Sequence, residues 1–163
     1  DEPWFPAKEG DWVMLQDKTL GKCVALTPES VQLVFLGGSH KLYPTLTFIS
    51  QNPQNLSGGF RLTTILRLDH MHRDEASKEV PAVLAKTVRE AITAELKPEQ
   101  LRSLTAEYRS STTVSLEFEI LADFAGEVAE RYDALRRSLQ RHALECANYN
   151  QWKLATQLIP LAG

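Results

Sequence analysis

The densest group of potential metal ligands in the sequence is His70-Met71-His72, followed closely by Asp74 and Glu75. Two histidines that alternate along a strand point to the same face, so the segment suits a divalent metal in principle. A zinc site needs three or four converging ligands, however, and the sequence supplies no clear third one. We therefore predict a polar turn between a strand and a helix, with no metal bound.

Cys146 and His142 lie four residues apart, which places them within contact distance on one face of a helix. A cysteine–histidine nucleophile also needs an orienting group, a cleft and an electropositive environment. The sequence indicates none of these, and we interpret Cys146 as a small buried or interface residue. The distant Cys23 forms neither a disulfide scaffold nor a zinc pattern with it, so we expect two reduced thiols in a cytosolic setting.

Three further groups contain residue types that can serve in catalysis or phosphate binding, but the residues around them do not form the motifs that such functions need. Ser110-Ser111 and Ser57-Gly58-Gly59 lack the flanking pattern of a nucleophile elbow or a phosphate loop, so we predict turns there. Glu117 and Glu119 alternate along a strand, which is typical of the solvated side of a sheet. The arginines between 131 and 141 are interleaved with carboxylates, which favours an exposed, salt-bridged helix. We predict no catalytic residue and no cofactor.

Short apolar and β-branched runs, separated by turn formers, occupy the first third of the chain. Their spacing predicts a small five-stranded β barrel or sandwich. The five expected strands are Asp11–Leu15, Gly21–Leu26, Val31–Leu36, Lys41–Tyr43 and Leu46–Ile49. The segment 51–59 is rich in turn formers, so we place a domain boundary there, between a small β domain at 1–58 and a second domain at 59–163.

The periodicity changes at Phe60, where apolar and polar residues begin to alternate and predict a strand through Asp69. Apolar residues then recur in steps of three and four. This spacing predicts a helix that starts near Ser77 to Pro81, because proline is tolerated in the first turn, and ends at Lys97-Pro98.

An antiparallel strand pair is expected next, at 101–108 and 113–121, with its turn at 109–111 and Val114 facing inward. Asp123 is a natural cap for a second helix that runs towards Cys146. A last strand is expected at 152–159. The order strand, helix, strand, strand, helix, strand is that of a ferredoxin-like domain, so the predicted fold class is α+β.

The composition is that of ordinary globular protein, since 43% of the 163 residues are hydrophobic and 24% are charged. A net charge of −3 creates no field that would attract phosphate backbones, so nucleic acid is not an expected partner. No apolar run approaches the roughly 20 residues that span a bilayer, and no signal segment opens the chain. The start at Asp1, without methionine, suits a fragment or a processed chain.

The order and spacing of several segments resemble the small-conductance mechanosensitive channel family, in which a small β domain and then a ferredoxin-like domain follow the pore helix. The similar segments are Phe5-Pro6, Gly10-Asp11-Trp12-Val13, Gly21-Lys22-Cys23-Val24, Leu42 to Ser50 and Asn55-Leu56-Ser57. The resemblance marks eight positions as structural or oligomer-forming: Gly10, Asp11, Trp12, Val13, Gly21, Pro44, Phe48 and Asn55.

By this resemblance, the parent protein is expected to be a homo-oligomer, typically a heptamer, whose gate lies in membrane helices before Asp1 and whose permeant species are ions. The present chain would build a hollow vestibule on the cytoplasmic side of a bacterial inner membrane. It would hold the subunits together, sieve solutes and influence gating or inactivation during osmotic stress. The resemblance carries over no enzymatic residue, and we expect no enzyme.

Two other functions stay open from the sequence alone. The first is a soluble protein- or RNA-interaction module, because small β domains and ferredoxin-like sheets serve both kinds of recognition. The expected sheet positions lack the paired aromatic and basic residues that favour RNA. The second is a metal-dependent enzyme centred on His70 and His72. Membrane helices encoded directly before Asp1 would favour the channel over both.

Overall fold

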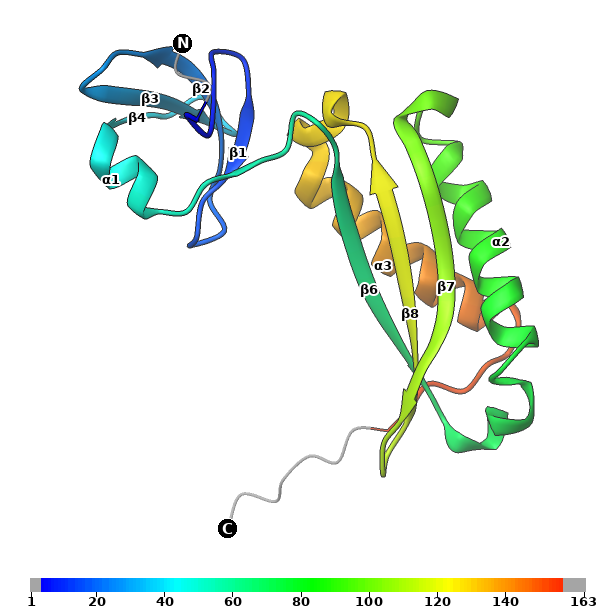
Figure 1. Cartoon of the computed structure of the whole chain (residues 1–163). Helices are drawn as coiled ribbons and strands as arrows, with labels where there is room; N and C mark the ends of the chain where they lie inside the picture. Colours follow the sequence, from blue (N-terminus) through cyan, green and yellow to red (C-terminus); the bar gives the residue numbers. More distant parts are fainter. Residues whose placement is uncertain (1–3, 157–163) are drawn as a thin grey trace. The chain divides into compact units, whose positions relative to one another are not determined.

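The computed structural model describes residues 4–156, and contacts between Cα atoms divide the chain into two compact units. The first unit holds the chain up to residue 60 together with residues 125–130. The second holds residues 61–124 and the chain from residue 131 onward. Figure 1 labels the helices and strands of both units, and each unit is described by itself.

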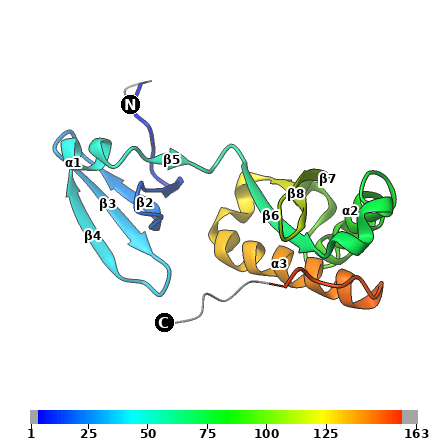
Figure 2. The same cartoon turned by 90° about the horizontal axis from the view of Figure 1, so that it is seen from below.

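The first unit is built on one five-stranded antiparallel sheet, as predicted, with the strand order β4-β3-β2-β1-β5. Its strands β2, β3 and β4 are seen side by side in Figure 2, with the short helix α1 after β4. The strands are β1 (Trp12–Met14), β2 (Leu20–Leu26), β3 (Ser30–Phe35), β4 (His40–Pro44) and β5 (Gln54–Asn55), and the helix is α1 (Thr45–Ser50).

One face of this sheet forms the core of the unit. Neighbouring strands place apolar side chains opposite one another, with Cys23 paired to Leu33 and Val31 paired to Tyr43. These four side chains are buried, and so is Phe48 of α1. Half-buried and buried positions alternate over residues 30–33 of β3, with the period of two that burial of one sheet face requires.

The last predicted strand of this unit is wrong. Residues Leu46–Ile49 lie in α1, which begins directly after Pro44 and places Phe48 in the core. Six residues with no strict alternation do not distinguish a helical turn from a short strand, and packing of Phe48 decides for the helix. The fifth strand is instead β5, whose two residues lie in the segment that was predicted to be a boundary.

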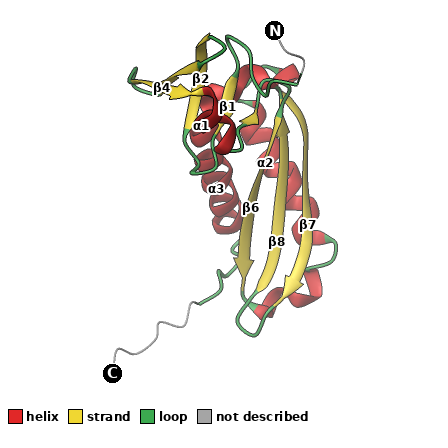
Figure 3. Cartoon of the chain, turned by 60° about the vertical axis from the view of Figure 1, so that its left-hand side comes forward, coloured by secondary structure: helices red, strands yellow, loops and turns green. Residues whose placement is uncertain are grey.

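The second unit has a three-stranded sheet with the order β6-β8-β7, and two helices, α2 and α3, cover one of its faces (Figure 3). Buried residues alternate with mostly exposed ones along β6 and with half-buried ones along β8, as predicted for strands with one face on the core. The elements are β6 (Phe60–Leu68), α2 (Glu79–Thr93), β7 (Leu101–Ser111), β8 (Leu116–Phe124) and α3 (Tyr132–Tyr149), with short 3-10 turns η1 (His70–Glu75), η2 (Pro98–Gln100) and η3 (Gly126–Arg131).

Both helices bury one apolar stripe. Helix α2 begins where the sequence predicts, with Pro81 in its first turn, and ends before the predicted limit at Lys97-Pro98. The spacing of three and four residues produces the apolar stripes that face the sheet. The buried residues are Val80, Leu84, Val88 and Ile92 in α2, and Leu135, Leu139, Ala143, Cys146 and Ala147 in α3.

Two predicted details of the second unit are wrong. The turn between β7 and β8 lies at 112–115, where Thr112 N and Ser115 O are bonded at 2.8 Å, and Val114 is exposed. Asp123 belongs to β8, so it caps no helix, and α3 begins only at Tyr132. The strands continue past their predicted ends because cross-strand pairing extends each of them, which single-strand periodicity does not reveal.

The predicted last strand at 152–159 is reduced, within the described residues, to one antiparallel bridge between Leu154 and Leu68. Its residues 157–159 lie outside the part of the chain that the structure describes. A ferredoxin-like sheet has four strands, whereas residues 4–156 form three strands and this bridge in the second unit. The bridge lies on the free edge of β6, which is the position that the fourth strand would take.

Candidate functional site

The candidate site lies in the first unit, where a tight turn presents a buried carboxylate. Gly10 has a φ of +93°, a conformation that favours glycine, and its N–H donates to Cys23 O at 2.7 Å. Asp11 follows at once, and its N–H donates to Lys8 O at 3.1 Å. The turn thus fixes the Asp11 side chain, which is only 6% exposed.

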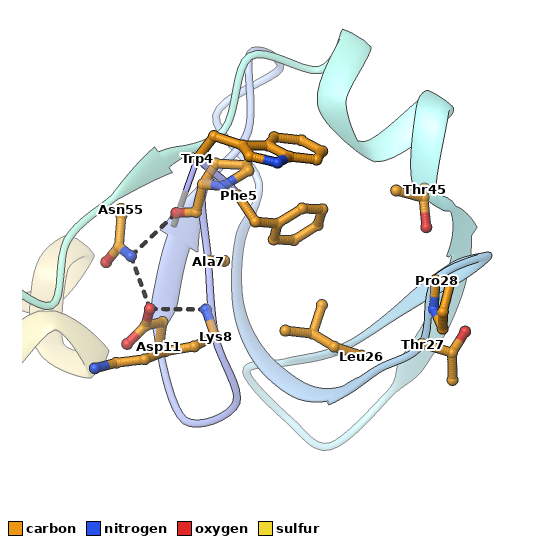
Figure 4. A pocket seen from close by; sticks show the side chains of 11 residues that line it. Trp4, Phe5, Ala7, Lys8, Asp11, Leu26, Thr27, Pro28, Thr45 and Asn55 are labelled. Carbon is orange, nitrogen blue, oxygen red and sulfur yellow. Dashed lines mark hydrogen bonds between the residues drawn. The ribbon is translucent and has the colours of Figure 1, made fainter. Parts of the chain in front are cut away.

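Asp11 and Asn55 tie three chain segments together (Figure 4). Asp11 Oδ2 accepts from Lys8 N at 3.0 Å and from Asn55 Nδ2 at 2.8 Å. Asn55 Nδ2 also donates to Pro6 O at 3.1 Å, and Asn55 Oδ1 accepts from Ser57 N at 2.9 Å. A buried carboxylate with two N–H donors is well satisfied, so this network holds the segment 6–11 against β5.

Val13 lies at the centre of the strands behind this network. It is fully buried and pairs with Gly21 on one side and Asn55 on the other. A Cβ atom at Gly21 would lie 3.2 Å from the ring of Phe35 and 3.3 Å from Leu33 Cβ, so glycine leaves room for those side chains. The register therefore brings three of the eight marked positions into one row.

Pro44 and Phe48 form a separate part of the same unit. Pro44 ends β4 and is the residue before the first turn of α1. The Phe48 ring is stacked with Phe5, with centroids 6.0 Å apart, and lies 6.4 Å from the Tyr43 ring. Aromatic packing thus connects α1 to the segment that Asn55 holds.

A pocket of about 720 Å³ opens between the segment 4–8, the turn after β2 and the start of α1 (Figure 4). Its volume lies in the range of small-molecule pockets, and its wall is mostly apolar. The buried Thr45 Oγ1 in this wall has no hydrogen-bond partner among the described residues. The lining residues are Trp4, Phe5, Pro6, Ala7, Lys8, Asp11, Leu26, Thr27, Pro28, Thr45 and Asn55.

The first unit also contains a close backbone contact that the sequence does not predict. Gly126, in the segment 125–130, packs against the backbone of Ser57, whose carbonyl oxygen would lie 1.8 Å from a Cβ atom at position 126. Ser57 Oγ in turn accepts from Trp12 N at 3.2 Å. Sequence separation hides this contact, and the local signal is an isolated glycine inside the helix that was predicted to follow Asp123.

Neither cysteine is arranged as a nucleophile. Burial, followed by the negative charges of Asp11 and Glu9, raises the pKa of Cys23 to about 11. Burial also raises the pKa of Cys146, so both groups are thiols at neutral pH.

His142 faces carboxylates, since its Nε2 lies 3.3 Å from Glu95 Oε2 and its Nδ1 lies 3.5 Å from Glu145 Oε2. The imidazole of His142 therefore already has two acidic partners, one on α3 and one just beyond the end of α2.

His70 and His72 lie in different environments, since His70 is half-buried and His72 is buried. His72 is buried and its Nε2 accepts from Lys153 N at 2.9 Å, so this nitrogen is occupied. Among residues 4–156, no three histidine, cysteine or acidic residues are grouped so that they could hold a metal ion. The turn η1 that contains both histidines is capped by Asp69, whose Oδ1 accepts from Met71 N at 2.9 Å.

No helix in the described part of the chain has both the length and the apolar character needed to cross a membrane.

Solved structures of mechanosensitive channels have a similar backbone. Helicobacter pylori MscS in a closed state matches with a TM-score of 0.63 and 15% identity, over 97% of this chain and 59% of that one. This chain has the MscS fold. MSL1 of Arabidopsis thaliana matches over 93% of this chain and 54% of its own, with a TM-score of 0.59 and 13% identity. A structure of wild-type MSL1 gives a TM-score of 0.65 and 15% identity over 93% of this chain and 52% of its own.

The resemblance to small-conductance mechanosensitive channels is therefore confirmed at the level of the fold. No protein-family model and no curated protein sequence matches the chain. The chain spans between 52% and 59% of the length of these MscS and MSL1 structures. The proteins with this fold that are compared above are channels and not enzymes.

Proposed function

We propose that this chain is the extramembrane assembly region of a channel that opens under membrane tension. The observation that carries the proposal is the fold shared with Helicobacter pylori MscS over 97% of the chain. The parent protein supplies membrane helices, and ions are its permeant species. The chain forms a vestibule in a homo-oligomer, a heptamer, on the cytoplasmic side of a bacterial inner membrane, and the channel responds to osmotic stress.

Within this proposal the chain has two assembly domains, at 1–58 and 59–163, and no catalytic role. The eight marked positions around Asp11, Val13 and Asn55 stabilise the first domain. Tension acts on segments embedded in lipid, so the soluble region affects assembly and inactivation more than the tension threshold.

The edge strand β4 supports the assembly role. It is the last strand of its sheet, so one row of its backbone groups has no partner strand among residues 4–156. Leu42 on β4 is 64% exposed, and Leu46 on the neighbouring α1 is 82% exposed. Exposed leucines beside an unpaired strand edge are typical of a surface that another chain covers.

Patch recording of the full-length parent protein in membranes tests the proposed function directly. We expect ion current that appears only when suction stretches the patch. The amount of protein in the membrane is measured in parallel, so that missing current is not confused with missing protein. Intact membrane protein that never conducts under tension would falsify the channel proposal.

The oligomer surface is tested separately in the same full-length protein. We expect Leu42→Lys to lower the oligomer fraction in size-exclusion chromatography with light scattering, because it places a charge on the exposed apolar edge. Val114→Lys is the matched control, since Val114 is an exposed valine in the β7–β8 turn. An oligomer fraction equal in both variants would remove the β4 edge from the interface and leave channel activity to the patch recordings.

A further inference from the structure

Residues 152–155, here called the edge segment, run along the free edge of β6. Ala155 N donates to Arg67 O at 3.1 Å, and Asp69 N donates to Lys153 O at 2.9 Å. These two backbone hydrogen bonds make up the one bridge between Leu154 and Leu68, so the segment has far fewer contacts with the sheet than a full strand makes. Trp152 at its start is buried and donates its N–H to Ala147 O at 2.8 Å, and one additional side-chain bond adds to this small set of contacts.

That additional bond comes from the side chain of His72. The residue lies in η1 and is only 6% exposed, and its Nε2 accepts from Lys153 N at 2.9 Å. An imidazole nitrogen accepts a hydrogen bond only when it carries no hydrogen, so this contact requires the neutral form of the ring with the proton on Nδ1. Protonation places a hydrogen on Nε2, which then faces the donor of Lys153. Two buried donors that face each other lose the bond and leave both groups unsatisfied.

We propose that His72 is a pH-sensitive latch that holds the edge segment on β6 at neutral pH and releases it in mildly acidic solution. An imidazole in water changes its charge near about pH 6.5. The bond is made by the deprotonated form, so docking is complete above the titration range of histidine and is lost as the pH falls through it. The inference rests on the second unit alone and does not depend on the proposed function.

Two charged pairs lie on the adjoining elements in the docked state. Asp69 Oδ1 accepts from Met71 N at 2.9 Å, and its Oδ2 lies 3.9 Å from Lys153 Nζ. β6 and β8 contribute Arg67 and Glu117, which are paired with each other at 2.8 Å. Asp69 therefore also connects η1 to the edge segment. The turn η1 carries four further ionisable side chains: His70, Arg73, Asp74 and Glu75.

Amide hydrogen exchange of the whole chain, followed by NMR at pH 7.5 and pH 5.5, tests the latch. We expect the protection factors of Lys153 and Ala155 to fall on the order of tenfold at the lower pH, because local opening becomes easier. Phe118, buried in β8, is the internal reference and keeps its protection. Equal protection of Lys153 at both pH values overturns the proposal, and equal loss at Phe118 overturns it in favour of global unfolding.

Two variants identify the titrating group. His72→Gln provides a neutral acceptor, so the protection of Lys153 becomes independent of pH, whereas His40→Gln changes an exposed histidine of β4 and keeps the wild-type dependence. A wild-type dependence in His72→Gln would assign the effect to another group. The ¹⁵N shifts of His72 in the wild-type chain give a test without mutation, because a hydrogen on Nε2 at pH 7.5 contradicts the latch.

Discussion

Gly126 is the residue at which the smallest change has the largest predicted effect. Its Cα lies so close to the Ser57 backbone that a Cβ atom would be 1.8 Å from the carbonyl oxygen and 2.3 Å from the carbonyl carbon. Backbone atoms of a paired segment do not move aside as a flexible side chain does. Glycine is therefore required here by the approach of two backbones and not by an unusual φ angle.

We expect Gly126→Ala to lower the free energy of unfolding by more than about 3 kcal/mol, because overpacking against backbone forces the segment to shift. Gly58→Ala is the matched control, since a Cβ atom at Gly58 would have no atom within 4 Å. The control should change stability by less than about 1 kcal/mol. Urea unfolding of both variants measures the difference, and equal midpoints would show that 125–130 does not pack on Ser57.

At the scale of elements, the strands of the second sheet are joined by charged pairs on the face opposite the helices. Arg61 of β6 donates to both carboxylate oxygens of Asp123 on β8, at 2.7 and 3.0 Å. Ser103 of β7 donates to the same carboxylate at 3.1 Å. The hydrogen bonds from the Arg61 guanidinium are the main reason that the pKa of Asp123 lies below its usual range. One carboxylate thus connects all three strands.

The pH dependence of this contact has a definite sign. Because the pKa of Asp123 is lower in the folded state, its contribution to stability is present above the unfolded value of about 3.9 and is lost as the pH falls through the folded value. We expect Asp123→Asn to reduce stability by up to about 1 kcal/mol at pH 7 and by much less near pH 3. Urea midpoints at both pH values measure this, with Asp74→Asn as an exposed control; a loss at pH 3 as large as at pH 7 contradicts the assignment.

The sequence predicted helices and strands correctly where the periodic pattern of apolar residues continued over many residues. Nine residues of alternation fix β6, and an apolar stripe from Val80 to Ile92 fixes α2, because each pattern has only one way to bury its apolar face. The helix α1 and the strand β5 have six and two residues, which is too short for a period. Their identity is decided by tertiary packing of Phe48 and by pairing of Asn55 with Val13.

The candidate site was predictable in part for the same reason. The resemblance marked Asp11 and Asn55, but the 2.8 Å bond between them joins residues 44 positions apart, and no local pattern encodes such a pairing. Thr45 in the pocket wall and Gly126 against Ser57 were not identified. Each matters through a neighbour that is remote in sequence or belongs to another element.

For the whole molecule, the question is how the stability of one unit affects assembly of the proposed channel. The side chain of Val13 is fully buried in the core of the first unit, and its strand lies between β2 and β5. A carboxylate at this position has no partner in an apolar core, and its burial costs several kcal/mol. Damage to this unit should therefore reduce the number of complete channels.

We expect Val13→Asp in the full-length parent to lower the yield of assembled channels at least about tenfold, since a loss of several kcal/mol unfolds a marginally stable domain. The channels that still form should open at nearly the wild-type tension. Val114→Asp, an exposed position, is the control and should assemble normally. Yield is measured by native electrophoresis and tension by patch recording; a large shift in threshold without loss of assembly would place tension sensing in this region.

The single bridge between Leu154 and Leu68 also determines how the molecule responds to mechanical load. A pull on the chain beyond residue 156 strains the bond from Ala155 to Arg67 first and the bonds of Lys153 afterwards, so they break one after another. Bonds that break in sequence yield at a lower force than strands sheared along their whole length. We therefore expect the edge segment to detach at a lower force than the force that separates the strands β6, β8 and β7.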